Sequence, residues 1–123
     1  MNSLNNRQHN VIVKPWGQEE ILELNDCYLV KRLTMHRGHR CSLQYHNKKR
    51  ETVYVLSGKL KIDLGHQDSE LNSAFYTPGD FITIPAKMVH RMEAVEDCVY
   101  LESSTPDTDD VVRLSDDYNR GER

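Results

Sequence analysis

The chain has few cysteines and no closely spaced pair of them. Its three cysteines, Cys27, Cys41 and Cys98, stand far apart, and no Cys-x-x-Cys motif occurs. The sequence therefore indicates neither a zinc knuckle nor a thioredoxin-type redox motif. We interpret the three cysteines as small apolar residues within strands.

Long apolar runs are missing as well. No stretch approaches the ~20 residues that a membrane-spanning helix needs, and residues 1–10 lack the apolar centre of a signal peptide. We therefore expect a cytoplasmic protein with no membrane partner. The change of texture at Val11 predicts a flexible N-terminal tail at 1–10 and a single domain at 11–123.

The chain also lacks an excess of positive charge. Its 16 Lys and Arg are outnumbered by 19 Asp and Glu, which gives a formal net charge of -3 at pH 7. Nucleic-acid-binding domains are usually basic, so we expect no nucleic-acid partner. A small anionic ligand remains compatible with this balance, because a local cluster can be positive on an acidic protein.

Helical periodicity is absent from every stretch of twelve or more residues. Short β-prone runs alternate with turn signals such as Ser57-Gly58 and Pro78-Gly79 instead, which predicts an all-β antiparallel sandwich or barrel. The acidic segment 106–123 contains apolar residues and is expected to be either a disordered end or a short helix or turn packed on the barrel. The predicted strands are residues 11–13, 20–24, 28–35, 41–46, 52–56, 60–64, 81–84, 89–93 and 98–103.

Four residues have the spacing of a metal site. Gln44 and His46 share one face of a predicted strand, and Glu51 opens the next one, so a hairpin of the two strands would bring all three together. His90 follows the turn at Pro85 and can meet them across a barrel. Two imidazoles, a carboxylate and an amide oxygen suit a divalent ion and leave room for water or substrate. Each residue alone is more often an ordinary core or surface residue, so the joint spacing carries this prediction.

Two motifs resemble those of the cupins. Gly38-x5-Gln44-x-His46-x4-Glu51-x6-Gly58 is similar to the first cupin motif, and Gly79-x5-Pro85-x4-His90 to the second. Gln-x-His in place of the usual His-x-His resembles the phosphomannose isomerase branch. The cupin resemblance implies a double-stranded β-helix, or jelly-roll barrel.

Two further stretches resemble the isomerase domain of bifunctional mannose-6-phosphate isomerase/mannose-1-phosphate guanylyltransferases. They are Lys14-Pro-Trp-Gly-Gln-Glu near the start and the Asp-Asp-Val-Val-Arg segment that ends at Arg113. The nucleotidyltransferase half is absent, so guanylyl transfer is not implied. The chain departs from the family at Lys49, where an Arg is usual, at Lys87, where a Gly is usual, and at Ala94, where an Asn is expected.

The resemblance implies a metal-dependent aldose–ketose isomerase that acts through an enediolate on a sugar phosphate or nucleotide sugar. It implies one divalent ion, with zinc as the first expectation and manganese, iron, cobalt or nickel as alternatives. Lys49, Arg50 and Arg113 are the candidates for acid/base chemistry and for holding the anion. The open sheet edges of a small cupin also favour a homodimer. Two other functions stay open: a binding or sensing module without turnover, and a metal-dependent dioxygenase.

Overall fold

Antiparallel strands form the whole described fold. In the computed structural model, residues 10–120 are described, and they contain eleven strands. The predicted tail at 1–10 lies outside this range except for Asn10, which begins the first strand. The all-β prediction is confirmed.

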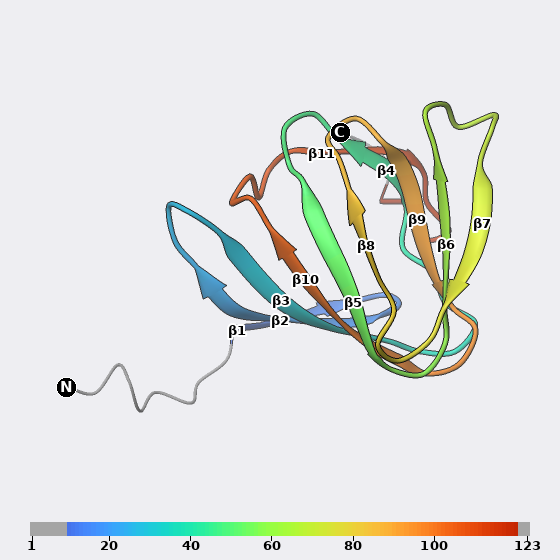
Figure 1. Ribbon diagram of the computed structural model, residues 1–123, viewed down its shortest axis with the longest axis horizontal. Helices are drawn as coiled ribbons and strands as arrows, with labels where there is room; N and C mark the ends of the chain where they lie inside the picture. The colour runs from blue at the N-terminus through green and yellow to red at the C-terminus, as the bar shows by residue number, and fades with distance from the viewer. Residues whose placement is uncertain (1–9, 121–123) are drawn as a thin grey trace.

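The strands form two sheets that face each other (Figure 1). The six-stranded sheet has the order β1-β2-β3-β10-β5-β8, and the five-stranded sheet has the order β11-β4-β9-β6-β7. The first sheet comprises β1 (Asn10–Lys14), β2 (Gly17–Leu24), β3 (Leu29–Met35), β10 (Cys98–Ser104), β5 (Glu51–Ser57) and β8 (Phe81–Ile84). The second comprises β11 (Val111–Ser115), β4 (Leu43–His46), β9 (Val89–Ala94), β6 (Leu60–Gly65) and β7 (Asn72–Tyr76).

Alternation along the strands explains which residues line the interior. In β5, Glu51, Val53 and Val55 are buried, while Tyr54 and Leu56 between and beyond them are exposed. Each run predicted from the sequence overlaps one of the observed strands, whereas β7 and β11 were not predicted. After β11 the chain makes a turn, and the described residues contain no helix. Consequently, none of them belongs to a helix long and apolar enough to cross a membrane.

The expected hairpin between residues 41–46 and 52–56 is wrong. β4 pairs with β11 and β9 in the five-stranded sheet, while β5 pairs with β10 and β8 in the other. The turn between them therefore carries the chain from one sheet to the opposite one. Residues at the end of β4 and the start of β5 meet across the interior rather than along a ladder.

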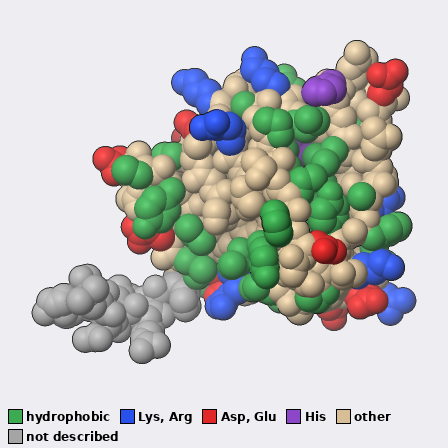
Figure 2. All heavy atoms as spheres, viewed as in Figure 1, with side chains coloured by type: hydrophobic (Ala, Val, Ile, Leu, Met, Phe, Trp, Pro, Cys, Tyr) green, Lys and Arg blue, Asp and Glu red, His purple; other side chains and the backbone are tan. Residues whose placement is uncertain are grey.

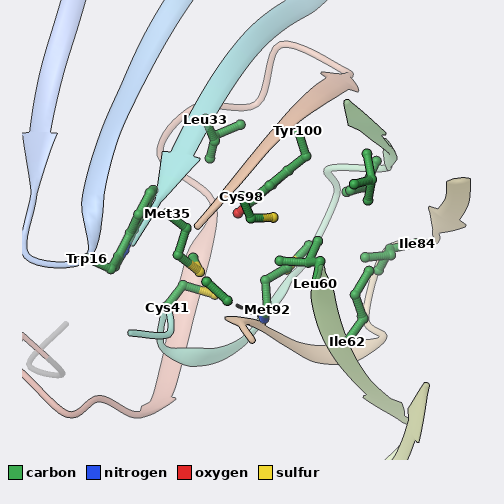
Figure 3. Packing of buried hydrophobic residues seen from close by; sticks show 13 residues of the cluster. Trp16, Leu33, Met35, Cys41, Leu60, Ile62, Ile84, Met92, Cys98 and Tyr100 are labelled. Carbon is green, nitrogen blue, oxygen red and sulfur yellow. Dashed lines mark hydrogen bonds between the residues drawn. The ribbon is translucent and has the colours of Figure 1, made fainter. Parts of the chain in front are cut away.

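An apolar core fills one end of the space between the sheets (Figure 3). Trp16, Met35, Leu60 and Ile62 are each at most 3% exposed. Figure 3 shows Trp16 against Met35 on one side of this cluster and Ile62 near Ile84 on the other. Apolar side chains from both sheets thus fill this end of the barrel, whereas the opposite end also buries charged residues such as Glu51 and Glu102.

Two glycines allow the tight turns that close the apolar end. Gly17 has φ +154°, and a Cβ there would overlap the carbonyl oxygen of Thr34. Gly58 has φ +81°, and a Cβ there would overlap the carbonyl oxygen of Asp97. Only glycine fits either position without moving the neighbouring strand. The motif glycine at 58 is therefore explained by backbone packing.

Candidate metal centre and its cavity

Three of the four predicted ligands converge at the polar end of the barrel. The candidate donor atoms of His46, Glu51 and His90 all lie within 4.8 Å of one another, and all three residues are buried. Oε2 of Glu51 is 3.2 Å from Nε2 of His90 and 3.8 Å from Nε2 of His46. The ligands come from β4, β5 and β9, so both sheets contribute to the cluster.

The tautomer of His90 suits a ligand. Its Nδ1 lies 2.9 Å from the carbonyl oxygen of Met88, which can only accept a hydrogen bond. Nδ1 therefore donates, and Nε2, which lies 3.2 Å from Oε2 of Glu51, is the nitrogen that would bind a cation after losing its proton. Within residues 10–120, Oε2 of Glu51, which faces both imidazoles, is a buried oxygen without a hydrogen-bond partner. These atoms fit a bound cation better than a closed hydrogen-bonded core.

Burial and neighbouring charges tune the three ligands differently. Burial, followed by the charges of Lys49 and His90, lowers the pKa of His46 to about 4, so its imidazole is neutral near pH 7. Burial alone would lower the pKa of His90, but the adjacent Glu51 carboxylate outweighs it and raises that pKa. Burial and the nearby Glu102 carboxylate raise the pKa of Glu51. A divalent cation would relieve the cost of holding these groups together without water.

Gln44 stands next to this cluster. It is paired with His90 in the ladder between β4 and β9, and it lines the same cavity. Its amide nitrogen lies 3.6 Å from Sγ of Cys41, an arrangement that leaves its carbonyl oxygen available as a fourth ligand. Burial raises the pKa of the Cys41 thiol to about 11, so this sulfur stays protonated beside the cluster.

A buried ion pair lies beside the candidate ligands. Nζ of Lys49 is 2.7 Å from Oε2 of Glu102, and both side chains are under a tenth exposed. Burial alone would raise the pKa of Glu102, but Lys49 and Lys31 hold it at about 2. Burial likewise works against the ammonium of Lys49, yet Glu102 and Glu51 raise its pKa. The cavity therefore contains a fixed positive charge next to the cluster.

The cluster opens into a cavity of about 340 Å³ between the two sheets. The candidate ligands Gln44, His46, Glu51 and His90 all line it, as do Lys49 and Arg113. Arg113 lies on β11 directly across from Gln44. This volume is enough for a small polar metabolite.

The structure places only one of the two adjacent basic residues in this cavity. Lys49 is buried and lines it, whereas Arg50 is exposed and lines a separate, shallower hollow with Thr52, Thr83 and Thr105. The backbone N–H of Arg50 donates to Oγ1 of Thr105, which keeps this residue on the outer side of the turn. The two side chains therefore lie in different hollows of the structure.

Four charged residues of the cavity wall were not identified from the sequence. Lys14, Glu19, Lys31 and Glu102 all line the cavity. Lys31 and Glu102 occupy inward positions of strands that otherwise place apolar residues inside, such as Leu33 and Tyr100. A charged residue among the inward-facing apolar positions of a strand could have identified Lys31 and Glu102. Using it requires knowing beforehand which alternate residues of the strand face inward.

Comparisons with known proteins agree with this architecture. The family described as "Mannose-6-phosphate isomerase C-terminal" matches residues 1–116. The mannose-1-phosphate guanylyltransferase of Escherichia coli K12 is 31% identical over 119 residues, which cover 93% of this chain and 24% of that protein. The xanthan biosynthesis protein XanB of Xanthomonas campestris is 29% identical over 117 residues, which cover 91% and 24%. The chain spans about a quarter of the length of these curated relatives.

Solved structures show the same fold. CapF, a capsular polysaccharide assembling protein from Staphylococcus aureus, superposes with a TM-score of 0.78 at 21% identity over 89% of this chain and 35% of that one. Oxalate decarboxylase OxdC of Bacillus subtilis, a protein described with Mn(II) centres, gives 0.73 at 24% identity over 90% and 30%. At these identities the likeness concerns the fold alone, and it confirms the cupin prediction.

Proposed function

Because the chain belongs to the mannose-6-phosphate isomerase C-terminal family, we propose that it is a metal-dependent isomerase interconverting an aldose phosphate and a ketose phosphate. One observation carries the proposal. The cluster of His46, Glu51 and His90 opens into a cavity that also contains the Lys49–Glu102 pair and Arg113. A reaction that moves a proton between two adjacent carbons needs a Lewis acid on the substrate oxygens and an acid/base close to the carbons. The cluster fits the first requirement, and the titratable side chains that line the cavity are the candidates for the second.

The donor set fits one divalent ion. His46, Glu51 and His90, with Gln44 as the fourth ligand, would hold it, and zinc, manganese, iron, cobalt and nickel all accept nitrogen and oxygen donors of this kind. When bound, the ion would supply Lewis-acid polarisation of the substrate oxygens at C1 and C2. The Mn(II) centres described for the oxalate decarboxylase of the same fold support this part of the proposal.

Lys49 is the residue that we assign to the reacting end of the substrate. Its ammonium is buried, held by Glu102 at 2.7 Å, and shielded from bulk water. A fixed positive charge in such a site stabilises the negative charge that develops on an enediolate oxygen, and it needs no reorganisation to do so. Arg113, on the opposite sheet, is assigned to the anionic end of the substrate. Arg50 has no role in this cavity.

The proposal is tested first by metal content and proton exchange. We expect the purified protein to hold one divalent ion per chain. In deuterated buffer it should exchange the C2 proton of mannose 6-phosphate, which NMR measures. His46→Ala and His90→Ala should lose the ion and the exchange together, because few ligands remain. A wild-type protein that binds sugar phosphates and exchanges no proton would instead be a binding or sensing module.

Arg113 provides the second test. Losing one charge-assisted contact costs about 1.5–3 kcal/mol, so Arg113→Ala should reduce kcat/KM by roughly ten- to a hundredfold. Metal content, measured by elemental analysis, should stay at the wild-type level. Equal kcat/KM in the variant and the wild type would remove Arg113 from the reaction and leave the metal assignment standing.

The proposal includes a homodimer in the cytoplasm. β1 is an edge strand, and its outer residues Val11 and Val13 are exposed, Val13 by 82%. Figure 2 shows further apolar side chains over one face of the molecule, with most charged groups near its margins. Such an edge can add to the sheet of a second copy. Light scattering at tens of micromolar should give twice the chain mass, and a monomeric mass would contradict the dimer.

A further inference from the structure

The short connection between β4 and β5 carries several of the residues assigned to metal binding and reaction. It follows the candidate ligand His46, contains Lys49 and ends at the candidate ligand Glu51. Its side chains point in different directions, because Lys49 is buried while Lys48 and Arg50 on either side of it are exposed. The backbone of this connection therefore determines where three groups of the cavity lie.

A second connection runs beside it. The segment 105–110 joins β10 to β11 and crosses from the six-stranded sheet to the five-stranded one, opposite in direction to the first connection. Figure 1 shows both connections at the same end of the barrel. The backbone N–H of Thr105 donates to the carbonyl oxygen of Arg50 at 3.0 Å, and the N–H of Arg50 donates to Oγ1 of Thr105 at 3.1 Å. These two bonds fix the part of the first connection that lies next to Glu51.

Asp110 holds the middle of the first connection. Its Oδ2 accepts hydrogen bonds from the backbone N–H groups of Lys48 at 2.6 Å and of Lys49 at 2.8 Å. Successive N–H groups in a turn form a concavity that binds an anion, and hydrogen bonds to a carboxylate are stronger than those between neutral groups. Burial alone would raise the pKa of Asp110, but these N–H groups outweigh it and lower that pKa. The carboxylate is therefore ionised near pH 7 and holds both amides.

Asp110 reaches the turn from a fixed position. It directly precedes β11, whose first residue, Val111, pairs with His46 in the ladder between β11 and β4. The backbone N–H of Lys87 also donates to the carbonyl oxygen of His46, at 2.7 Å. The strand end that carries His46 and the carboxylate beside it are thus placed before any ligand arrives, which keeps the cost of ordering low.

The contact acts through the backbone and not through the cavity. Thr108 and Asp109 line the cavity, but Asp110 does not. Its hydrogen bonds end on the peptide groups from which the side chain of Lys49 starts, and that side chain reaches Glu102 at 2.7 Å. Asp110 can therefore influence the site by orienting the connection, without contacting an ion or a substrate itself.

We infer that Asp110 is a positioning residue for the metal centre and for Lys49. By holding the backbone of Lys48 and Lys49, its carboxylate fixes the connection between the ligands His46 and Glu51. The inference rests on the proposed function for the role of Lys49 in the reaction. Its effect on metal binding rests on the geometry of the three-residue cluster.

The test compares zinc affinity in Asp110→Ala, Asp110→Asn and the wild type, each as the full chain, by competition with a chelating dye. Asp110→Ala should weaken zinc binding by about tenfold, as is typical when a group that supports metal ligands is lost. Asp110→Asn should keep most of the affinity. Both hydrogen bonds end on one oxygen, Oδ2, and an amide still offers one oxygen. The asparagine variant thereby separates the hydrogen bonds from the negative charge.

Asp97→Ala is the matched control. Oδ1 of Asp97 accepts the backbone N–H of Arg37, a residue equally far away in the sequence, at 2.8 Å, but Asp97 does not line the cavity. Asp97→Ala should leave zinc affinity at the wild-type level, even where it lowers the free energy of unfolding. Hydrogen exchange of residues 47–51, measured by mass spectrometry without metal, should become faster in Asp110→Ala and stay unchanged in Asp97→Ala.

Several outcomes would overturn the inference. Unchanged zinc affinity or unchanged exchange at 47–51 in Asp110→Ala would do so, as would a wild-type protein that binds no zinc. An equal loss of affinity in Asp110→Asn would assign the effect to charge, and an equal loss in Asp97→Ala would assign it to general stability.

The result is separable from the isomerase proposal. Exchange of the C2 proton by the wild type, combined with unchanged zinc affinity in Asp110→Ala, refutes the positioning role alone. A loss of zinc affinity that is confined to Asp110→Ala, combined with a wild type that exchanges no proton, refutes the isomerase alone.

Discussion

The two ends of the barrel interior are built from the same strands but from opposite kinds of residue. In the six-stranded sheet, one row across the strands consists of Leu33, Tyr100 and Val55. Two residues further along these strands, toward the ligands, the corresponding row contains Lys31 and Glu102, and only Val53 of β5 remains apolar. In β9 of the facing sheet, the inward residue changes from Met92 to His90 over two positions.

The apolar end mainly stabilises the fold, whereas the polar end carries the residues proposed for metal binding and reaction. The apolar end gains stability from burial of side chains that are interchangeable with others of similar volume. The polar end buries charges whose removal from water is costly and which are tolerated because each has a partner. Substitutions at the two ends should therefore differ in how they change the free energy of unfolding and the affinity for metal.

The largest effect is expected from breaking the charge pair at the polar end. Lys49→Met leaves Glu102 buried without its partner and should lower the free energy of unfolding by about 3–5 kcal/mol, measured in urea. The double variant Lys49→Met/Glu102→Leu should recover most of this loss, because no uncompensated charge remains. If the double variant is as unstable as the single one, the pair acts through packing and not through charge.

A cavity created at the apolar end should lower the free energy of unfolding almost as much but leave metal binding unchanged. Leu60 is fully buried in the core, and Leu60→Ala should lower the free energy of unfolding by about 2–5 kcal/mol. The folded variant should still bind one metal ion per chain with wild-type affinity. A loss of metal affinity in this variant would show that the two ends are mechanically coupled.

The pH dependence of the free energy of unfolding should reveal the lowered pKa of His46 at the polar end. Its pKa is about 4 in the folded protein and near 6.5 when unfolded, so the unfolded chain binds more protons between these values. The stabilisation is present above pH 6.5 and is lost as the pH falls through about 4. With metal removed by a chelator, the stability difference between wild type and His46→Gln should change by on the order of 3 kcal/mol over this window. A constant difference would contradict the buried, neutral imidazole.

The smallest effect is expected at Gln44. A neutral amide is the poorest donor of the four ligands, so Gln44→Ala should weaken metal binding by about tenfold or less, roughly 1.4 kcal/mol. Competition with a chelating dye measures this directly, with His90→Ala as the reference for full loss. A loss in Gln44→Ala as large as in His90→Ala would make the amide an essential ligand.

The sequence predicted most strands because apolar residues alternate in them and turn residues separate them. It missed β7, whose residues Asn72 to Phe75 are all exposed, because an edge strand without a buried face has no alternation to detect. It missed β11 because Val111 to Leu114 lie between acidic segments, which are typical of a solvated end.

The metal ligands were predictable because their spacing along the chain is fixed, whereas the pairing of the strands that carry them was not. The same hydrophobic pattern fits a hairpin and a crossing between sheets, and only long-range packing decides between the two. Lys87 is a related case. It stands where the resemblance expects glycine, and it adopts φ +72°, a backbone conformation that glycine reaches most easily.

The origin of the ligands on two facing sheets has a consequence for folding. His46 and His90 belong to the five-stranded sheet and Glu51 to the six-stranded one, so a bound ion would cross-link the two layers. A partly folded chain with one sheet formed cannot assemble this site. Metal binding would therefore favour the fully packed state by mass action, by about 2.7 kcal/mol when free metal is a hundredfold above its dissociation constant. The ion would then hold the two layers together at the end where charged residues interrupt the apolar packing.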